Sequence, residues 1–229
     1  MTLRVPATIT ALVFDMDGLM LDTEPIYRAS WQRTAAELGW EITDEGYEPF
    51  LGRRTEDAER DLAHRFGPTF PIARFHGRWP VLWEDIAAAG LAVKPGVHAL
   101  LDVADRHGLP LALATSTARG LAVRTLGYGG FTPERFRVMV TGDEIAHGKP
   151  APDIYLEAAR RLGVPPERCA AFEDSDAGTI SAGRAGMTVF QVPDMKVPSA
   201  DARAAAYRVL ASLEEVPRHL TPLLARTRA

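Results

Sequence analysis

The sequence predicts an α/β fold, with a doubly wound parallel sheet and an inserted α-helical subdomain. Short apolar runs alternate along the chain with helical patterns, which indicates alternating strands and helices. Apolar residues in these runs are largely continuous and do not alternate with polar ones, as in strands that are buried on both faces. Residues 22–90 break this alternation, because they show helical patterns only. A chain of 229 residues is long enough for one large domain or two small ones.

Five apolar runs rich in β-branched or bulky residues are expected to form the strands. They are bounded by turn or acidic residues, and the connections between strands and helices are short. The runs are Ile9–Phe14, Leu109–Ala114, Arg137–Val140, Cys169–Phe172 and Met187–Val192. A last strand near Tyr207–Ala211 and a helix with Leu213, Val216 and Leu220 are expected in the tail.

Helices are predicted between these strands, and each ends at a glycine. Val97–His107 and Asp153–Leu162 place apolar side chains on one face, and Ser175–Ala185 follows the fourth run. Another helix is expected from Thr117 onward. Parallel strands joined by helices in this way carry helices on both faces of the sheet.

The inserted segment is expected to contain three helices. Thr23 is expected to cap a helix that runs to Gly39, and Thr55 a second helix that runs to Phe66. The third spans about Ile72–Ala89. We therefore expect a core domain of residues 1–21 and 91–229, and an inserted helical domain of residues 22–90.

Composition excludes several classes of protein. The chain is 46% hydrophobic and 24% charged, near the globular average, which excludes a disordered or collagenous protein. Its net charge of −4 offers no basic field to a polyanion, so no nucleic-acid partner is expected. The first apolar run stops at Asp15, and neither a signal peptide nor a membrane span is predicted. The single cysteine, Cys169, cannot form an intrachain disulfide, which is consistent with a reducing compartment, so we expect a cytoplasmic protein. The sequence shows neither a coiled coil nor an interface stripe, so a monomer is expected by default.

Polar side chains follow four of the predicted strands. Because the carboxyl ends of parallel strands meet at one edge of a sheet, we expect these side chains to converge there. They are Asp15 and Asp17 after the first strand, Thr115 and Ser116 after the second, Lys149 after the third, and Glu173 and Asp174 after the fourth.

This set of side chains suits a metal-assisted reaction on a phosphate ester. Four carboxylates cannot all be ionised together without a cation, and Mg²⁺ is the ion that best fits such a site. Thr115 and Ser116, at the start of a helix, would bind a phosphate group, and Lys149 would add a positive charge. A carboxylate is then available as the nucleophile.

Four segments resemble the motifs of the haloacid dehalogenase-like hydrolase superfamily. Residues 14–25, FDMDGLMLDTEP, are similar to its first motif, and Thr115-Ser116 to its second. Residues 148–153 (GKPAPD) and 172–175 (FEDS) resemble the third and fourth. The insertion resembles the small helical cap of the subfamily that holds β-phosphoglucomutase and many sugar-phosphate and nucleotide phosphatases. The resemblance implies a Rossmann-like core.

The resemblance also implies a role for each acidic residue. Asp15 would be the nucleophile that takes the phosphoryl group, and Asp17 the general acid and base. Asp15, Glu173 and Asp174 would bind Mg²⁺ together with the backbone carbonyl of Asp17. In the cap, Arg53 and Arg54 are candidates for substrate contact, although a solvated arginine pair is an equal alternative. Glu24 is a weaker candidate, since an acidic residue also favours a helix N-terminus.

Within the superfamily, the residues favour a phosphatase of small phosphomonoesters such as sugar phosphates or nucleotides, acting through an aspartyl-phosphate. The dehalogenase branch lacks an aspartate at the position of Asp17, so the presence of Asp17 favours phosphoryl chemistry. β-Phosphoglucomutase carries a histidine where this chain has Tyr27, and a lysine where it has Ala118-Arg119. Phosphoryl transfer between sugar positions, as in that mutase, is the first alternative. A non-catalytic module that binds phosphate ligands or serves in signalling is the second.

Overall fold

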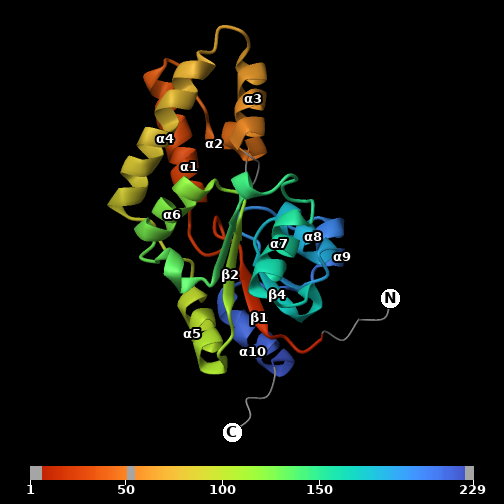
Figure 1. The fold of residues 1–229 in the computed structure, drawn as a ribbon. Coiled ribbons are helices and arrows are strands. Elements are labelled where there is room, and N and C mark those ends of the chain that lie inside the picture. Colours follow the sequence, from red (N-terminus) through yellow and green to blue (C-terminus); the bar gives the residue numbers. More distant parts are fainter. Residues whose placement is uncertain (1–6, 51–54, 225–229) are drawn as a thin grey trace. The chain divides into compact units, whose positions relative to one another are not determined.

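The computed structural model describes residues 7–50 and 55–224 (Figure 1). The chain divides into two compact units. The core unit is Met1–Leu21 with Val93–Ala229, and the insertion unit is Asp22–Ala92. Among the described helices, none combines the length and the apolar character that a membrane span requires.

The core unit is built on a six-stranded sheet with the order β3-β2-β1-β4-β5-β6. Every neighbouring pair in it is parallel, which confirms the predicted doubly wound sheet. The strands are β1 (Ala11–Phe14), β2 (Leu111–Thr115), β3 (Val138–Thr141), β4 (Cys169–Glu173), β5 (Thr188–Gln191) and β6 (Arg208–Val209). The last strand has two residues and is shorter than the expected Tyr207–Ala211.

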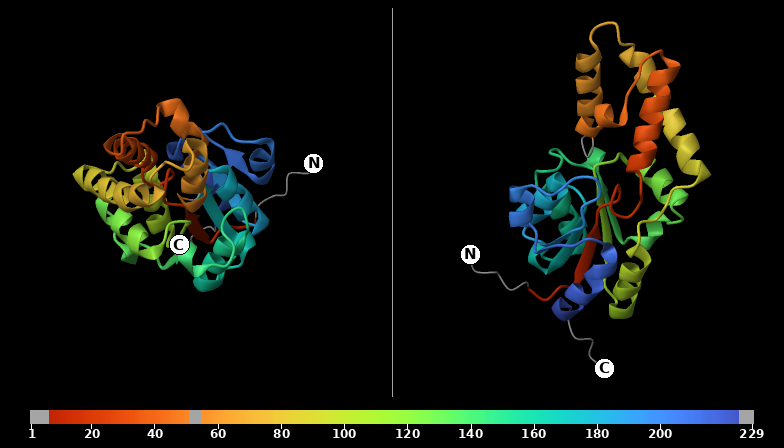
Figure 2. Two further views of the ribbon diagram at one scale, coloured as in Figure 1. Left: turned by 90° about the horizontal axis from the view of Figure 1, so that it is seen from above. Right: turned by 180° about the vertical axis from the view of Figure 1, so that it is seen from behind.

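Helices cover both faces of this sheet (Figures 1 and 2). Helices α5, α6 and α10 lie on one face, and α7, α8 and α9 on the other. Their bounds are α5 (Val97–His107), α6 (Arg119–Tyr128), α7 (Asp153–Leu162), α8 (Asp176–Arg184), α9 (Ala200–Ala205) and α10 (Val216–Leu220). Short 3₁₀ helices span Pro133–Arg135, Gly142–Glu144, Pro166–Arg168, Leu213–Glu215 and Thr221–Leu223.

The helix ends follow from local backbone chemistry. Helices α5 and α7 end at Gly108 and Gly163, which take left-handed φ values of 60° and 73° that other residues rarely adopt. The expected helix start at Thr117 is wrong by two residues. Ala118 is extended, with ψ 147°, so α6 begins at Arg119.

The strand register places the polar side chains at one edge of the sheet. Phe14, the last residue of β1, pairs with Leu113 of β2 and with Phe172 of β4. The residues that follow these three positions therefore lie side by side where the strands end, with Asp15 after Phe14 and Glu173 after Phe172.

The regular secondary structure described in the insertion unit is all helical. Its helices are α1 (Glu24–Glu37), α2 (Asp44–Tyr47), the 3₁₀ helix Glu48–Phe50, α3 (Thr55–Phe66) and α4 (Ile72–Ala89). Aromatic rings form its interior: the ring of Trp31 lies 5.3 Å from that of Phe75 and 6.2 Å from that of Trp79, centroid to centroid. The expected cap at Thr23 is wrong, because its φ and ψ of −82° and −25° are already helical and its side chain makes no capping bond. Thr55 is the first residue of α3 and not its cap.

Candidate active site

The loop after β1 holds Asp15 in a buried position. The Asp15 side chain is 8% exposed, and its backbone N–H donates to the carbonyl of Phe172 across 3.1 Å. Gly18 turns the chain with φ 78°. A side chain at Gly18 would place its Cβ 2.5 Å from Oδ2 of Asp174. Glycine is therefore needed both for the turn and for the close approach of Asp174.

Lys149 joins two carboxylates of this edge. Its Nζ lies 2.5 Å from Oδ1 of Asp15 and 2.6 Å from Oε1 of Glu173, and it also donates to the carbonyl of Ala114 at 3.1 Å. The Lys149 side chain is 6% exposed. Burial opposes its positive charge, but Asp15 and Glu173 outweigh that effect and hold the pKa of Lys149 above its ordinary value. The ammonium group is therefore a permanent charge beside Asp15.

Asp17 has different neighbours from Asp15. Its Oδ2 accepts hydrogen bonds from the hydroxyls of Thr115, at 3.2 Å, and Thr117, at 2.8 Å. The backbone N–H of Thr117 in turn donates to the hydroxyl oxygen of Thr115 at 3.1 Å. Two carboxylates two residues apart thus differ in environment: Asp15 is bound to an ammonium group, and Asp17 to neutral hydroxyls.

Three carboxylates form an acidic cluster, which we define as Asp15, Glu173 and Asp174. One ligand atom from each lies within 4.8 Å of the others. Burial raises the pKa of Asp15 and of Asp174 well above the ordinary value; Lys149 lowers both pKa values, and neighbouring carboxylates raise them. When all are ionised, three carboxylates and one ammonium of Lys149 leave two negative charges. Oxygen donors with this excess charge fit a hard divalent cation such as Mg²⁺.

Glu173 is the most enclosed member of the acidic cluster, with no exposed surface. Its Oε1 accepts from the hydroxyl of Tyr155 at 2.5 Å, and its Oε2 from the hydroxyl of Ser175 at 3.1 Å. Burial raises the pKa of the Tyr155 phenol, so it stays a donor. The sequence patterns did not single out Tyr155, Ser175 or Thr117 as site residues. Tyr155 is a buried residue of α7, and a hydroxyl directed at a carboxylate leaves no trace in spacing.

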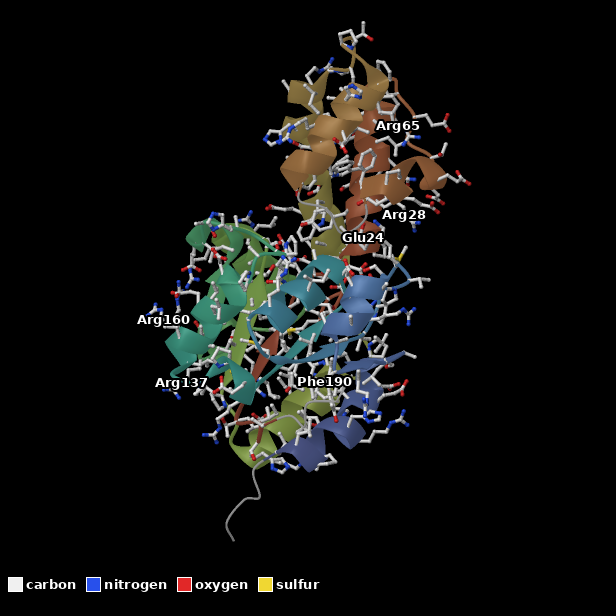
Figure 3. All side chains as sticks on the ribbon, turned by 90° about the vertical axis from the view of Figure 1, so that its right-hand side faces the viewer. Glu24, Arg28, Arg65, Arg137, Arg160 and Phe190 are labelled. Carbon is white, nitrogen blue, oxygen red and sulfur yellow. The ribbon has the colours of Figure 1, made fainter. Side chains whose placement is uncertain are left out.

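The remaining candidates are Ser116 in the core unit and Glu24, Arg53 and Arg54 in the sequence of the insertion unit. Ser116 is exposed, and Gly142 packs against its backbone carbonyl. In the insertion unit, Oε1 of Glu24 on α1 accepts from the hydroxyl of Tyr47 at 3.0 Å (Figure 3). Arg53 and Arg54 lie outside the described residues.

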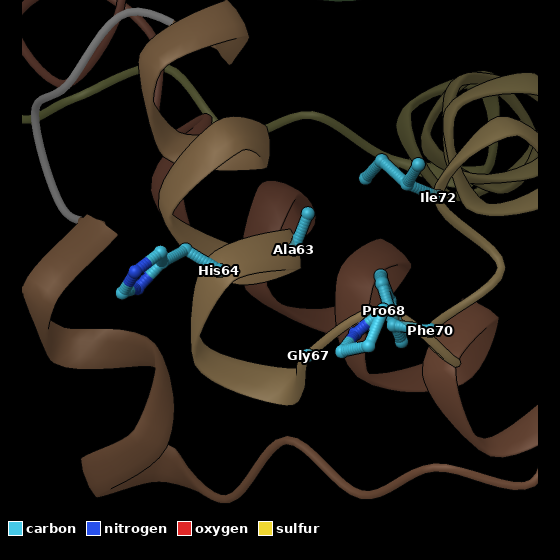
Figure 4. Close-up of a pocket in the computed structure, with 6 residues that line it drawn as sticks. All are labelled: Ala63, His64, Gly67, Pro68, Phe70 and Ile72. Carbon is cyan, nitrogen blue, oxygen red and sulfur yellow. The ribbon is translucent and has the colours of Figure 1, made fainter.

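A pocket of about 520 Å³ opens within the insertion unit, at the end of α3 and the start of α4 (Figure 4). Its lining is Ala63, His64, Gly67, Pro68, Phe70 and Ile72. Of these six residues only His64 has an ionisable side chain, so the pocket lacks the charged groups that a phosphate ester requires.

Comparison with known proteins identifies the family. The model of the haloacid dehalogenase-like hydrolases matches residues 9–186, a span that includes the acidic cluster, Asp17 and Lys149. The chain belongs to this family. The resemblance inferred from the four sequence motifs is thereby confirmed.

Relatives cover almost the whole chain. Protein CbbY of Rhodobacter capsulatus is 38% identical over 211 residues, which are 88% of this chain and 92% of that protein. A probable pseudouridine-5′-phosphatase of Drosophila melanogaster is 35% identical over 230 residues, 93% of each chain. The crystal structure of a CbbY mutant from Rhodobacter sphaeroides in complex with xylulose-1,5-bisphosphate superposes with a TM-score of 0.75 and 32% identity. That superposition covers 90% of this chain and 96% of the other. These matches confirm that the chain is an enzyme of this hydrolase family, and the relative named as a phosphatase agrees with the predicted enzyme class.

Proposed function

We propose that this enzyme is a Mg²⁺-dependent phosphatase of small phosphomonoesters and that Asp15 carries the phosphoryl group during turnover. The observation that supports this most directly is the contrast between two neighbouring carboxylates. Asp15 is buried against Lys149, whereas Asp17 is held by two hydroxyls. One carboxylate is thus oriented for attack and the other for proton transfer.

The first half-reaction moves the phosphoryl group from substrate to enzyme. A carboxylate oxygen of Asp15 forms a bond to phosphorus, the bond from phosphorus to the leaving oxygen breaks, and Asp17 gives its proton to that oxygen. Lys149 holds the phosphate oxygens, and the hydroxyl of Thr115 turns from Asp17 to donate to them. In the second half-reaction a water molecule gives a proton to Asp17 and attacks phosphorus, which releases phosphate and restores Asp15.

The acidic cluster and the backbone carbonyl of Asp17 would hold Mg²⁺. Bound there, the ion supplies neutralisation of the charge on the phosphate oxygens. We further propose that Glu24, Arg53 and Arg54 of the insertion unit contact the leaving group. In support of this role for Glu24, its carboxylate is fixed by the Tyr47 hydroxyl.

For the substrate we propose a phosphate ester of a sugar, with or without an attached base. Of the relatives above, one is named for pseudouridine 5′-phosphate and another binds xylulose-1,5-bisphosphate. Hydrolysis is favoured over mutase chemistry by the packing of Tyr27. The ring centroid of Tyr27 lies 5.4 Å from that of Trp83 and 5.9 Å from that of Trp79. The side chain that stands where the mutase has its histidine therefore packs against indole rings.

A panel assay tests the proposal. Phosphate release is measured with Mg²⁺ on sugar phosphates and nucleotides, and glucose 6-phosphate formation is measured from β-glucose 1-phosphate with a trace of its 1,6-bisphosphate. Asp15→Asn should abolish turnover, while Asp105→Asn, at a surface ion pair with Arg135, should leave it unchanged. EDTA should stop the reaction and Mg²⁺ should restore it. Turnover by Asp15→Asn would exclude Asp15 as nucleophile, and glucose 6-phosphate with little free phosphate would favour the mutase.

A further inference from the structure

We propose that Tyr155 is a positioning residue of the active site. Through its hydrogen bond to Glu173, it fixes the carboxylate that holds Lys149 beside Asp15. The inference rests on the phosphatase function proposed above, in which Lys149 binds the phosphate group of the substrate. It adds a residue that lies outside the four sequence motifs.

Donors from three residues converge on Glu173, and Ser175 supplies two of them, because its backbone N–H also lies 3.4 Å from Oε2. On Oε1 the carboxylate accepts from Lys149 at 2.6 Å and from Tyr155 at 2.5 Å, and on Oε2 from the Ser175 hydroxyl at 3.1 Å. Glu173 has no exposed surface, so water cannot replace a donor that is lost. A buried carboxylate with its partners in place is held rigidly, and removal of one partner leaves a polar group unsatisfied at a cost in free energy.

Tyr155 contacts both members of the ion pair between Lys149 and Glu173. Besides its bond to Glu173, its ring centroid lies 5.2 Å from Nζ of Lys149, within the range of a cation–π contact. Lys149 and Tyr155 lie six residues apart, at the turn before α7 and in its first turn. The segment that supplies the ammonium group therefore also supplies the side chain that fixes its partner.

The Tyr155 hydroxyl affects how strongly each of two carboxylates, Asp15 and Glu173, attracts Lys149. Both Asp15 and Glu173 accept from the same Nζ. Because the Tyr155 hydroxyl neutralises part of the charge on Oε1, Glu173 attracts Lys149 less strongly. Without that hydroxyl, Glu173 would draw Nζ away from Asp15 and from an incoming phosphate group.

Tyr155→Phe tests this role, since it keeps the ring and its contact with Lys149 and removes only the hydroxyl. The Kd of the Mg²⁺-loaded full chain for inorganic phosphate, measured by calorimetry, should rise about tenfold, which corresponds to about 1.4 kcal/mol. The kcat/KM for p-nitrophenyl phosphate should fall by a similar factor. Tyr155→Leu removes the ring as well, so it should change both the Kd and the kcat/KM by a larger factor. The matched control is Tyr207→Phe, whose ring packs on Phe190 at 5.6 Å, and it should change neither value.

The outcomes separate this inference from the proposed function. A Tyr155→Phe variant with a lower melting temperature but an unchanged phosphate Kd would make Tyr155 a packing residue only, and would overturn the inference. A parallel loss of Mg²⁺ affinity, measured by calorimetry without phosphate, would show that the hydroxyl acts on the metal site and not on Lys149. Failure of the wild-type chain to hydrolyse any ester of the panel counts against the proposed function alone, because phosphate binding still reports on Tyr155. A wild-type chain that neither hydrolyses an ester nor binds phosphate would refute both.

Discussion

Alanine in place of Gly178 should destabilise the core unit, although the same change in most helices stabilises them. Gly178 lies in the first turn of α8, where its N–H donates to the hydroxyl of Ser175 at 3.0 Å. A Cβ built on Gly178 would lie 1.8 Å from Oε1 of Glu173, less than any van der Waals contact allows. The carboxylate has no room to move aside, because Lys149 and Tyr155 hold the same oxygen.

The size of the effect follows from two opposing terms. Replacing glycine by alanine inside a helix favours folding by about 1 kcal/mol. Displacing Glu173 takes one partner away from the buried ion pair between Glu173 and Lys149, which costs about 3–5 kcal/mol. The net loss for Gly178→Ala is therefore about 2–4 kcal/mol, or a melting temperature lower by roughly 4–16 °C for a protein of this size.

Thermal unfolding of the full chain tests this prediction, with Gly127→Ala as the matched control. Gly127 lies inside α6, and a Cβ built there meets no atom within 4 Å. Its replacement should therefore raise the melting temperature by about 2–4 °C. The two substitutions are chemically the same and are predicted to have opposite signs. A Gly178→Ala variant as stable as the wild type would refute the packing argument around Glu173.

Two further predictions concern Glu157 and Thr117. Arg160, which is labelled in Figure 3, and Arg161 donate hydrogen bonds to Glu157 on α7 and lower its pKa to about 2. That stabilisation is present above the unfolded pKa near 4.3 and is lost as the pH falls toward 2. Glu157→Gln should thus cost less than about 1 kcal/mol at pH 7, and urea titrations should show the difference from wild type vanish near pH 2; a constant difference would contradict the assignment. Thr117→Val removes one of the two described hydroxyl donors to Asp17. It should lower kcat about tenfold but the melting temperature by only about 2–4 °C; unchanged kcat would remove Thr117 from the site.

The sequence predicts the sheet well because its signals are local. Continuous apolar runs mark strands buried on both faces, and the glycines after α5 and α7 mark helix ends. Both signals lie within a few consecutive residues. Its errors concern single residues whose conformation depends on neighbours. Thr23 has a good capping side chain, but its backbone is already helical, so the hydroxyl is not used. Ala118 is extended, which delays the start of α6.

The residues of the candidate site also differ in whether local sequence signals reveal them. Asp15 and Glu173 are found from sequence because each follows an apolar strand, and strand ends meet at one edge. Tyr155 and Thr117 are not found, because their part in the site lies in contacts across 2.5 and 2.8 Å to residues far away in the chain. Such contacts depend on how α7 packs on the sheet and on the extended turn before α6, and no spacing rule encodes either.

The entry and exit of the insertion unit are adjacent. The N–H of Asp22 donates to the carbonyl of Ala92 at 2.9 Å, so the two ends of the unit meet at one hydrogen bond. Next to them, Leu21 and Val93 of the core unit form an antiparallel bridge. A segment whose ends are neighbours can be exchanged as a cassette, because a replacement needs only to begin and end at the same two points and leaves every strand of the sheet uncut. Recombination or engineering can thus replace residues 22–92 as one piece, so that new recognition elements are grafted onto an unaltered reaction centre.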